Sequence, residues 1–253
     1  MNELQTIYYL PEDDSLGAGD IDREKLKKLA VEGAMDWIES HYDLNKELRV
    51  GVGSGSTVEY AFSSLADHPN ITAVPTSHQT REYLKELGVE VDQLEKPDEL
   101  IFDLDGADEV DPDLNLIKGG GGCHYREKAV AKQSKSLLVV VDQTKLVDYL
   151  GQSFPLPVEV EPSNKDKTRA LLVNYGEPSF RQNEEGLFRT DNDNLIIDVK
   201  LSKGIEKKDL GRLEREINRL DGVVENGFFV NRRADMVFVG TENGLEIFGD
   251  EAK

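Results

Sequence analysis

The sequence predicts an α/β protein with a mostly parallel sheet covered by helices on both faces, followed by a smaller α+β unit. Short apolar segments alternate with amphipathic segments from residue 22 to residue 141. Such alternation implies parallel strands joined by helices that cover the sheet. The segment 136–141 contains five consecutive apolar residues, which suits a strand buried on both faces. Two prolines within 154–158 then interrupt the pattern.

The first domain begins with an amphipathic helix after Asp22, in which apolar residues from Leu26 to Ile38 recur at helical spacing. Strands and helices are then expected to alternate. The expected strands are 48–52, 71–74, 89–91, 100–104 and 136–141, and the expected helices pass through Ala61 and Leu65, 78–87 and 127–135. Segments 237–239 and 245–248 are expected to return to the same sheet. We therefore assign residues 20–153 and 230–253 to one Rossmann-like domain.

The second domain is expected to cover residues 154–229. Its predicted elements are a strand at 158–160, a helix at 166–175, a strand at 195–199, a helix at 210–220 and a strand at 223–229. This order suits a ferredoxin-like α+β domain with its helices on one face of a short sheet. Residues 1–19 hold Pro, Gly, Asp and Glu with little periodicity, so we expect a poorly ordered arm there.

The charge of the chain argues against several kinds of partner. Its 50 Asp and Glu against 30 Lys and Arg give a net charge of −20, which repels nucleic acid and anionic membranes. These acidic residues are spread along the chain, and a salt-adapted origin and an ordinary acidic enzyme both remain open. A single cysteine and the lack of an apolar run or secretory leader favour a cytoplasmic protein.

Polar residues follow several of the predicted strands. Gly53, Thr76, Asp105 and Asp142 each come directly after a strand or at its end. In parallel sheets ligands bind beyond these carboxyl ends, so we expect the four segments to meet at one edge. The turn at 51–57 offers backbone N–H groups and three hydroxyls to a phosphate. Its spacing fits neither a dinucleotide fingerprint nor a P-loop, and a plain structural turn remains equally open.

A second segment has a composition that no core requires. Five carboxylates lie between Asp103 and Asp111, and four consecutive glycines follow Lys118. No calcium-loop register and no histidine pair with metal-ligand spacing occur, so we expect no metal. A carboxylate near a lysine suits proton transfer next to a carbonyl, with Glu127 as base and Lys118 stabilising the oxyanion. A solvated helix start at residues 126–128 is the alternative.

The order of these motifs resembles the A-type ribose-5-phosphate isomerases. The motifs are the Gly-Ser turn, Thr76-Ser77, Asp105-Gly-Ala-Asp-Glu109, Leu116-Ile-Lys-Gly-Gly-Gly-Gly122, Arg126-Glu-Lys128, Phe154-Pro-Leu-Pro-Val-Glu-Val160 and Arg233-Ala-Asp235. The resemblance runs from about Asp22 to Gly249. It implies reversible interconversion of ribose 5-phosphate and ribulose 5-phosphate without a cofactor, in the pentose phosphate pathway, by a homodimer or homotetramer.

The resemblance also implies roles for individual residues. Glu127 would shuttle a proton between C2 and C1 through an enediolate, and Lys118 would neutralise the oxyanion. Asp105 would assist ring opening, and Asp108 would orient the substrate hydroxyls and Lys118. The implied substrate and phosphate contacts are Ser54, Gly55, Ser56, Thr57, Lys145 and Lys28 or its neighbour Lys27, with Gly119, Gly120 and Gly121 as a substrate loop.

Some residues depart from the family pattern. Cys123, His124 and Tyr125 stand where small and apolar residues are more usual, and His124 is either a group that titrates near the base or a lining residue. The alternative function is a sugar-phosphate sensor that binds without turnover. A sensor of that kind would carry a DNA-binding unit, whereas the first 50 residues offer one amphipathic helix and no basic patch.

Overall fold

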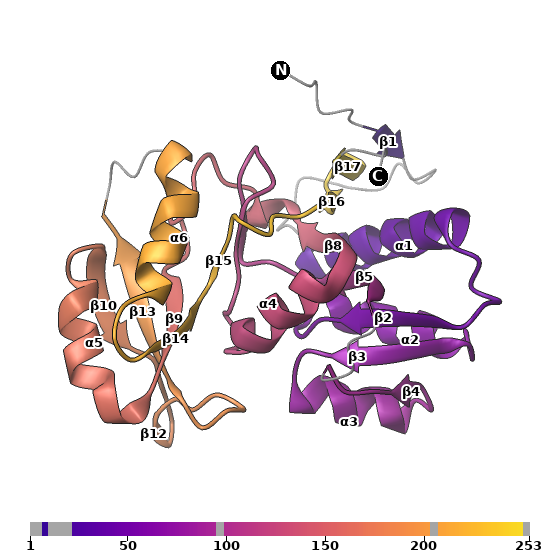
Figure 1. Cartoon of the computed structure of the whole chain (residues 1–253). Helices are drawn as coiled ribbons and strands as arrows, with labels where there is room; N and C mark the ends of the chain where they lie inside the picture. Colours follow the sequence, from indigo (N-terminus) through magenta and orange to yellow (C-terminus); the bar gives the residue numbers. More distant parts are fainter. Residues whose placement is uncertain (1–6, 10–21, 95–98, 203–206, 250–253) are drawn as a thin grey trace. The chain divides into compact units, whose positions relative to one another are not determined.

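A computed structural model describes residues 7–9, 22–94, 99–202 and 207–249 of the chain (Figure 1). The chain divides into two compact units. The first unit comprises Met1–Gly106, Ala129–Leu146 and Ala234–Lys253, and the second comprises Ala107–Lys128 and Val147–Arg233. No helix within these described ranges is long and apolar enough to cross a membrane.

The first unit is built on one large sheet. Its described strands lie in the order β1-β17-β16-β8-β5-β2-β3-β4. Neighbours from β16 to β4 run parallel, whereas β17 pairs antiparallel with β16 and β1. The bounds are β1 Ile7–Tyr9, β2 Leu48–Val52, β3 Ile71–Pro75, β4 Glu90–Val91, β5 Leu100–Asp105, β8 Ser134–Asp142, β16 Met236–Thr241 and β17 Gly244–Gly249. The predicted mostly parallel sheet is confirmed.

The helices of this unit follow from local sequence. Helix α1 spans Arg23–His41, is capped by the Asp22 side chain and packs on β8 and β16 (Figure 1). Helix α3 spans His78–Glu86, and its first turn is capped by the Ser77 hydroxyl, as expected for a short polar side chain at that position. The remaining helical segments are η1 Val58–Ala61, α2 Phe62–Ala66, η2 Gln143–Lys145 and α4 His124–Gln133, whose N-terminal residues belong to the second unit.

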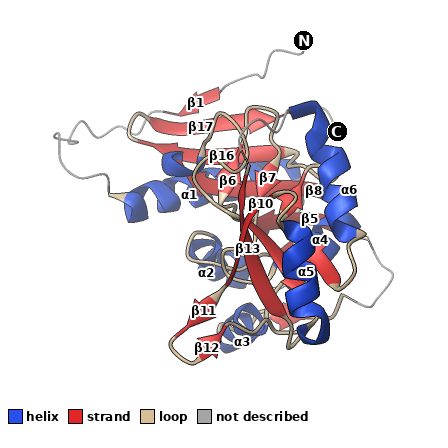
Figure 2. Cartoon of the chain, turned by 90° about the vertical axis from the view of Figure 1, so that its left-hand side faces the viewer, coloured by secondary structure: helices blue, strands red, loops and turns tan. Residues whose placement is uncertain are grey.

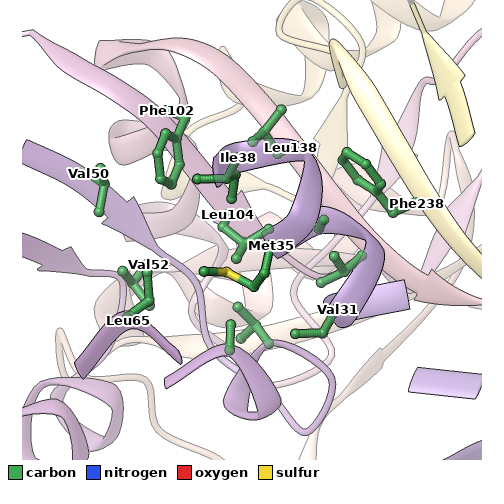
Figure 3. Close-up of a cluster of buried hydrophobic side chains, with 14 of the residues drawn as sticks. Val31, Met35, Ile38, Val50, Val52, Leu65, Phe102, Leu104, Leu138 and Phe238 are labelled. Atoms are coloured by element: carbon green, nitrogen blue, oxygen red, sulfur yellow. The ribbon is translucent and has the colours of Figure 1, made fainter. Parts of the chain in front are cut away.

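A hydrophobic core fixes the strand ends of the first unit. Val31, Met35 and Ile38 of α1 lie over strand residues that include Val50, Val52, Phe102, Leu104, Leu138 and Phe238 (Figure 3). Gly51 lies on the opposite face, because successive strand residues alternate. A Cβ at Gly51 would overlap the side chain of Val130 in α4. The sheet is therefore covered on both faces, as predicted.

The second unit contains a four-stranded antiparallel sheet in the order β10-β13-β9-β14. Its elements are β9 Leu156–Val160, η3 Pro162–Asn164, α5 Lys165–Leu172, β10 Gly176–Phe180, β13 Leu195–Leu201, η4 Lys207–Asp209, α6 Leu210–Asn218 and β14 Val223–Asn226. Figure 2 shows α5 beside β13. Residues of both helices, Leu172 and Ile217, pack in one cluster with Val158 and Ile197. Both helices therefore cover the same face, which gives the ferredoxin-like arrangement expected.

The division into units differs from the predicted domain boundaries. Residues 107–128, 147–153 and 230–233 group with the second unit. The reason is a small sheet in which β7 (Leu116–Ile117) pairs with β6 (Glu109–Val110) and β15 (Phe228–Phe229). The second unit also contains the hairpin of β11 (Gln182–Asn183) and β12 (Gly186–Leu187).

The predicted N-terminal arm lies mainly outside the described residues. One part of it, Ile7–Tyr9, forms β1 and pairs with β17 at the edge of the large sheet. Isolated backbone pairing of this kind leaves no signal in side-chain periodicity. The rest of the arm, residues 1–6 and 10–19, is not described.

Candidate active site

The candidate residues of the first unit meet at the carboxyl ends of its parallel strands. Strands β2, β3, β5 and β8 are neighbours. The N–H of Gly53 bonds Leu104 O at 2.9 Å, and that of Thr76 bonds Val52 O at 3.0 Å. The predicted convergence of strand ends at one edge is confirmed for this unit.

Asp105 ends β5 and lies against the turn that follows β2. Its side chain is fully buried, and its Oδ1 accepts the N–H of Gly106 at 2.7 Å. A Cβ built on Gly53 would overlap the Asp105 carboxylate. Only glycine fits at this position, so the first glycine after β2 is there to admit the carboxylate.

Hydroxyl groups organise the Gly-Ser turn, which we define as residues 53–57. The Ser54 hydroxyl lies 2.8 Å from Thr76 Oγ1 and 2.9 Å from Thr80 Oγ1. Gly55 has a φ of +123° and open space where a side chain would be. The turn then enters η1 after Thr57. A glycine at a positive φ with open space beside it and several hydroxyls nearby is a suitable cradle for an anion.

The structure distinguishes the two adjacent lysines of α1. Lys27 Nζ donates to Ser56 Oγ at 3.0 Å and to Glu24 Oε1 at 2.7 Å, and its side chain is only 15% exposed. Lys28 Nζ instead lies 5.2 Å from the ring centroid of Tyr60. The lysine at the Gly-Ser turn is therefore Lys27.

The last candidate of the first unit, Lys145, ends η2 directly after β8. Asp142 caps this short helix, because its Oδ1 accepts the N–H of Thr144 at 2.8 Å. The cap fixes the path of the chain up to Lys145, whose side chain stands half-buried at the end of η2.

In the second unit, strand pairing brings Asp108 and Lys118 together. Glu109 lies opposite Ile117 in the antiparallel β6–β7 pair, so Asp108 and Lys118 stand next to each other at one end of it. The N–H of Asp108 bonds Ile117 O at 2.9 Å, and the N–H of Lys118 bonds Gly227 O at 2.9 Å. Both backbones are therefore held in place.

Lys118 and Glu127 form a buried ion pair. Lys118 Nζ lies 3.4 Å from Glu127 Oε2, and the two side chains are 3% and 5% exposed. Glu127 occupies the first turn of α4, with its N–H bonded to Cys123 O at 3.0 Å. The alternative of a solvated helix start is wrong, because Glu127 and Lys128 are both buried. An ammonium and a carboxylate placed this way suit proton transfer with charge stabilisation.

The glycine loop, defined as residues 119–122, is fitted closely to its neighbours. A Cβ would lie 2.6 Å from His124 Nδ1 at Gly119, 2.5 Å from Asp108 Oδ1 at Gly120 and 2.6 Å from the Phe188 ring at Gly122. At Gly121 a Cβ would meet nothing within 4 Å. Asp108 also accepts the N–H of Gly120 at 2.7 Å through Oδ2. Three of the four glycines are therefore required by close approach.

Comparison with known proteins identifies the family of this chain. The family model for ribose 5-phosphate isomerase A (phosphoriboisomerase A) matches residues 72–244. The chain belongs to this family. The ribose-5-phosphate isomerase A of Staphylococcus aureus (strain COL) is 41% identical over 211 residues, covering 81% of this chain and 91% of that protein. That of Prochlorococcus marinus (strain NATL1A) is 41% identical over 227 residues, covering 86% and 92%.

Solved structures of the family have the same fold. A D-ribose-5-phosphate isomerase in complex with phospho-erythronic acid superposes with a TM-score of 0.83 at 34% identity, covering 91% of this chain and all 100% of that one. The isomerase A of Methanocaldococcus jannaschii gives 0.80 at 35% identity, covering 90% and 99%. The Plasmodium falciparum enzyme gives 0.82 at 30% identity, covering 91% and 100%.

A buried charge network directly after Glu127 was not foreseen from the sequence. Lys128 is 1% exposed and donates to Glu214 Oε1 at 3.0 Å, Glu225 Oε1 at 2.9 Å and Asn226 O at 2.7 Å. Burial alone would raise the pKa of Glu225, but Lys128 and the hydrogen bonds that Glu225 accepts hold it below its ordinary value. The network fixes the residue that directly follows Glu127.

His124, one of the departures from the family pattern, lies fully buried behind the glycine loop. Its Nε2 lies 3.4 Å from Glu225 O. Burial, with the nearby Lys128 charge second, lowers the pKa of His124 to about 3. The imidazole is therefore neutral around physiological pH, and of the two expectations the structure favours the lining residue.

No group of three or more His, Cys, Asp or Glu side chains that could hold a metal ion occurs within the described parts of the chain.

Glu109, a carboxylate of the acidic motif, stabilises a loop of the second unit. Its carboxylate accepts the N–H groups of Gly151, Ser153 and Phe154 at 2.5 to 2.7 Å. Glu109 therefore anchors the loop that leads into β9.

Proposed function

We propose that this chain interconverts D-ribose 5-phosphate and D-ribulose 5-phosphate, with Glu127 as the base and Lys118 as the group that stabilises the enediolate. The observation that carries the proposal is the 3.4 Å pair of Lys118 and Glu127, held almost without solvent contact at the glycine loop. A sensor that binds without turnover has no need of a base in such a setting. Membership of the isomerase A family supports the enzyme over the sensor.

In the proposed reaction Glu127 first accepts a proton from the substrate and later donates one back to it. Glu127 removes the proton on C2 of the open-chain aldose, and the electrons of that bond form the C1–C2 double bond of the enediolate. Lys118 stabilises the negative oxygen as it develops, in a buried setting where such interactions are strong. The proton on Glu127 exchanges with solvent, Glu127 then delivers a proton to C1, and the proton of the C2 hydroxyl is transferred to O1. Donors held in place before reaction need no reorganisation during it.

The remaining candidates have supporting roles in this proposal. Asp105 assists opening of the sugar ring. Asp108 positions the glycine loop through the Gly120 N–H at 2.7 Å, which in turn places the Gly119–Gly121 backbone and Lys118. We assign these roles because each carboxylate is fixed by a backbone hydrogen bond.

The phosphate is proposed to bind at the Gly-Ser turn of the first unit, by Ser54, Gly55, Ser56 and Thr57, with Lys145 as a further contact. We assign the lysine of α1 to Lys27, because its ammonium reaches Ser56 Oγ at 3.0 Å while Lys28 lies over Tyr60. A positive charge beside backbone N–H groups at a turn is a recurring phosphate site.

The reaction as proposed needs neither a metal nor an organic cofactor, because one carboxylate and one ammonium supply the acid–base and electrostatic work. We further propose a cytoplasmic homodimer or homotetramer acting in the pentose phosphate pathway. The net charge of −20 argues against nucleic acid and anionic membranes as partners.

Conversion of ribose 5-phosphate by the purified chain tests the proposal. Glu127→Gln preserves the shape of the side chain and removes the base, so we expect kcat to fall by roughly 10³-fold. Glu177→Gln, at an exposed position of β10, is the matched control and should retain wild-type activity. Saturable binding of ribose 5-phosphate by the wild type without any conversion would instead favour the sensor.

A further inference from the structure

The glycine loop is held by a residue that no motif identified. Arg181 follows β10 directly, and its Nη1 donates to Gly119 O at 2.8 Å and to Gly120 O at 2.9 Å. One nitrogen thus bridges two successive carbonyls of the loop. An arginine Nη carries two hydrogens in a fixed plane, so this contact sets the orientation of both peptide groups.

Asp198 in β13 orients the guanidinium. Its two carboxylate oxygens accept from Arg181 Nε at 2.9 Å and from Nη2 at 2.5 Å. This bidentate geometry leaves the side chain no freedom to rotate. The pair is largely shielded from solvent, with side chains 13% and 19% exposed. The Phe188 ring lies beside the guanidinium and also against Gly122.

The charge of Arg181 is balanced by Asp198, and most of its N–H donors are bonded within the protein. Four of its five N–H donors have partners in Asp198 and the loop carbonyls. Arg181 is therefore not arranged to bind a substrate phosphate.

We propose that Arg181, oriented by Asp198, is a positioning residue for the isomerisation. Arg181 donates to the carbonyl oxygens of Gly119 and Gly120, while Asp108 accepts the N–H of Gly120. The two side chains together fix the orientation of the glycine loop. The loop directly follows Lys118, so its orientation determines where the Lys118 ammonium lies relative to Glu127. All these residues belong to the second unit. The inference rests on the proposed function.

The test compares Arg181→Lys with Arg189→Lys in steady-state assays on ribose 5-phosphate. Arg189 pairs with Asp193 on the surface of the same unit and is the matched control. Lysine keeps the charge at Arg181 but cannot reproduce the planar fork. We expect kcat to fall roughly 10- to 100-fold, as for a small misplacement of a catalytic group, while KM changes less than about threefold.

Asp198→Asn provides the second variant and carries the test if Arg181→Lys folds poorly. It should lower kcat with little change in KM, and the double variant should lose no more than Arg181→Lys alone, because the aspartate acts through the arginine. An unchanged kcat in both single variants would overturn the inference. So would a raised KM with unchanged kcat, or a loss of activity equal to the loss of folded protein. An inactive wild type would refute the proposed function instead.

Discussion

Buried His124 makes the stability of this protein depend on pH in a way that one substitution removes. An ordinary histidine has a pKa near 6.5, and that of His124 in the folded state is about 3. As the pH falls below 6.5 the unfolded chain binds a proton that the folded chain cannot bind. Folded-state stability is therefore lost as the pH falls from 6.5 towards 3.

The magnitude follows from the two pKa values. Each pH unit in this window corresponds to about 1.4 kcal/mol, so the free energy of unfolding should fall by about 2 kcal/mol between pH 7 and pH 5 because of His124 alone. The assay is urea unfolding of the wild type and of His124→Gln at both pH values and constant ionic strength. Carboxylates titrate in both proteins and cancel in the comparison.

We expect the variant to lose about 2 kcal/mol less than the wild type on acidification. His78→Gln, which removes an exposed histidine, controls for the loss of any imidazole. Equal acid sensitivity of wild type and His124→Gln would show that the buried neutral imidazole is not the cause.

Three further predictions concern the glycine loop, the two lysines of α1 and the net charge. Gly120→Ala should lower kcat/KM about 100-fold or more, because its Cβ would lie 2.5 Å from Asp108 Oδ1. Gly121→Ala should leave the unfolding temperature unchanged, because a Cβ there meets nothing within 4 Å. Equal changes of kcat/KM and of unfolding temperature in the two variants would contradict this prediction. Lys27→Ala should raise KM for ribose 5-phosphate roughly 10- to 100-fold, as for a lost charged hydrogen bond, and Lys28→Ala less than about threefold, with the reverse order contradicting the assignment. With a net charge of −20, thermal unfolding in molar potassium chloride should occur at a higher temperature than in dilute buffer, and an unchanged temperature would exclude self-repulsion as a factor.

The parts of the fold that could be predicted are those with local periodicity. Strands β2, β3 and β5 were located from apolar spacing, and the structure places them within one residue of the expected bounds. Helix α1 was expected after Asp22, and it extends three residues beyond Ile38, the last apolar position of the expected pattern. The two-residue strands β6 and β7 were missed, since two residues show no period and the partner β15 lies far along the chain.

The segment 223–229 shows a different limit. It was predicted as one strand, but Gly227 divides it between two sheets. The N–H of Gly227 bonds Pro157 O, and its carbonyl accepts from Lys118. A Cβ there would overlap Lys118 O. Tertiary packing of this kind decides the strand break and cannot be inferred from the local sequence.

In the candidate site, too, the residues with a local sequence signal could be predicted, and those that depend on tertiary contacts could not. Glu127 and Lys118 carry motif signals and were named from the sequence. Lys27 and Lys28 are adjacent on one helix, and they are distinguished by the contacts of Lys27 with Ser56 and of Lys28 with Tyr60. Arg181 and Lys128 were not identified from the sequence, because their partners Asp198 and Glu214 lie in other elements. In the sequence alone, both residues resemble ordinary surface charges.

Solvent isotope incorporation shows whether Glu127 transfers the proton. Ribose 5-phosphate is mixed with the purified protein in deuterated buffer containing a metal chelator and followed by proton NMR. We expect conversion to ribulose 5-phosphate with deuterium entering at C1, and conversion and exchange roughly 10³-fold slower with Glu127→Gln. Conversion at the wild-type rate by Glu127→Gln, or dependence of the reaction on added metal, would contradict a metal-independent proton transfer by Glu127.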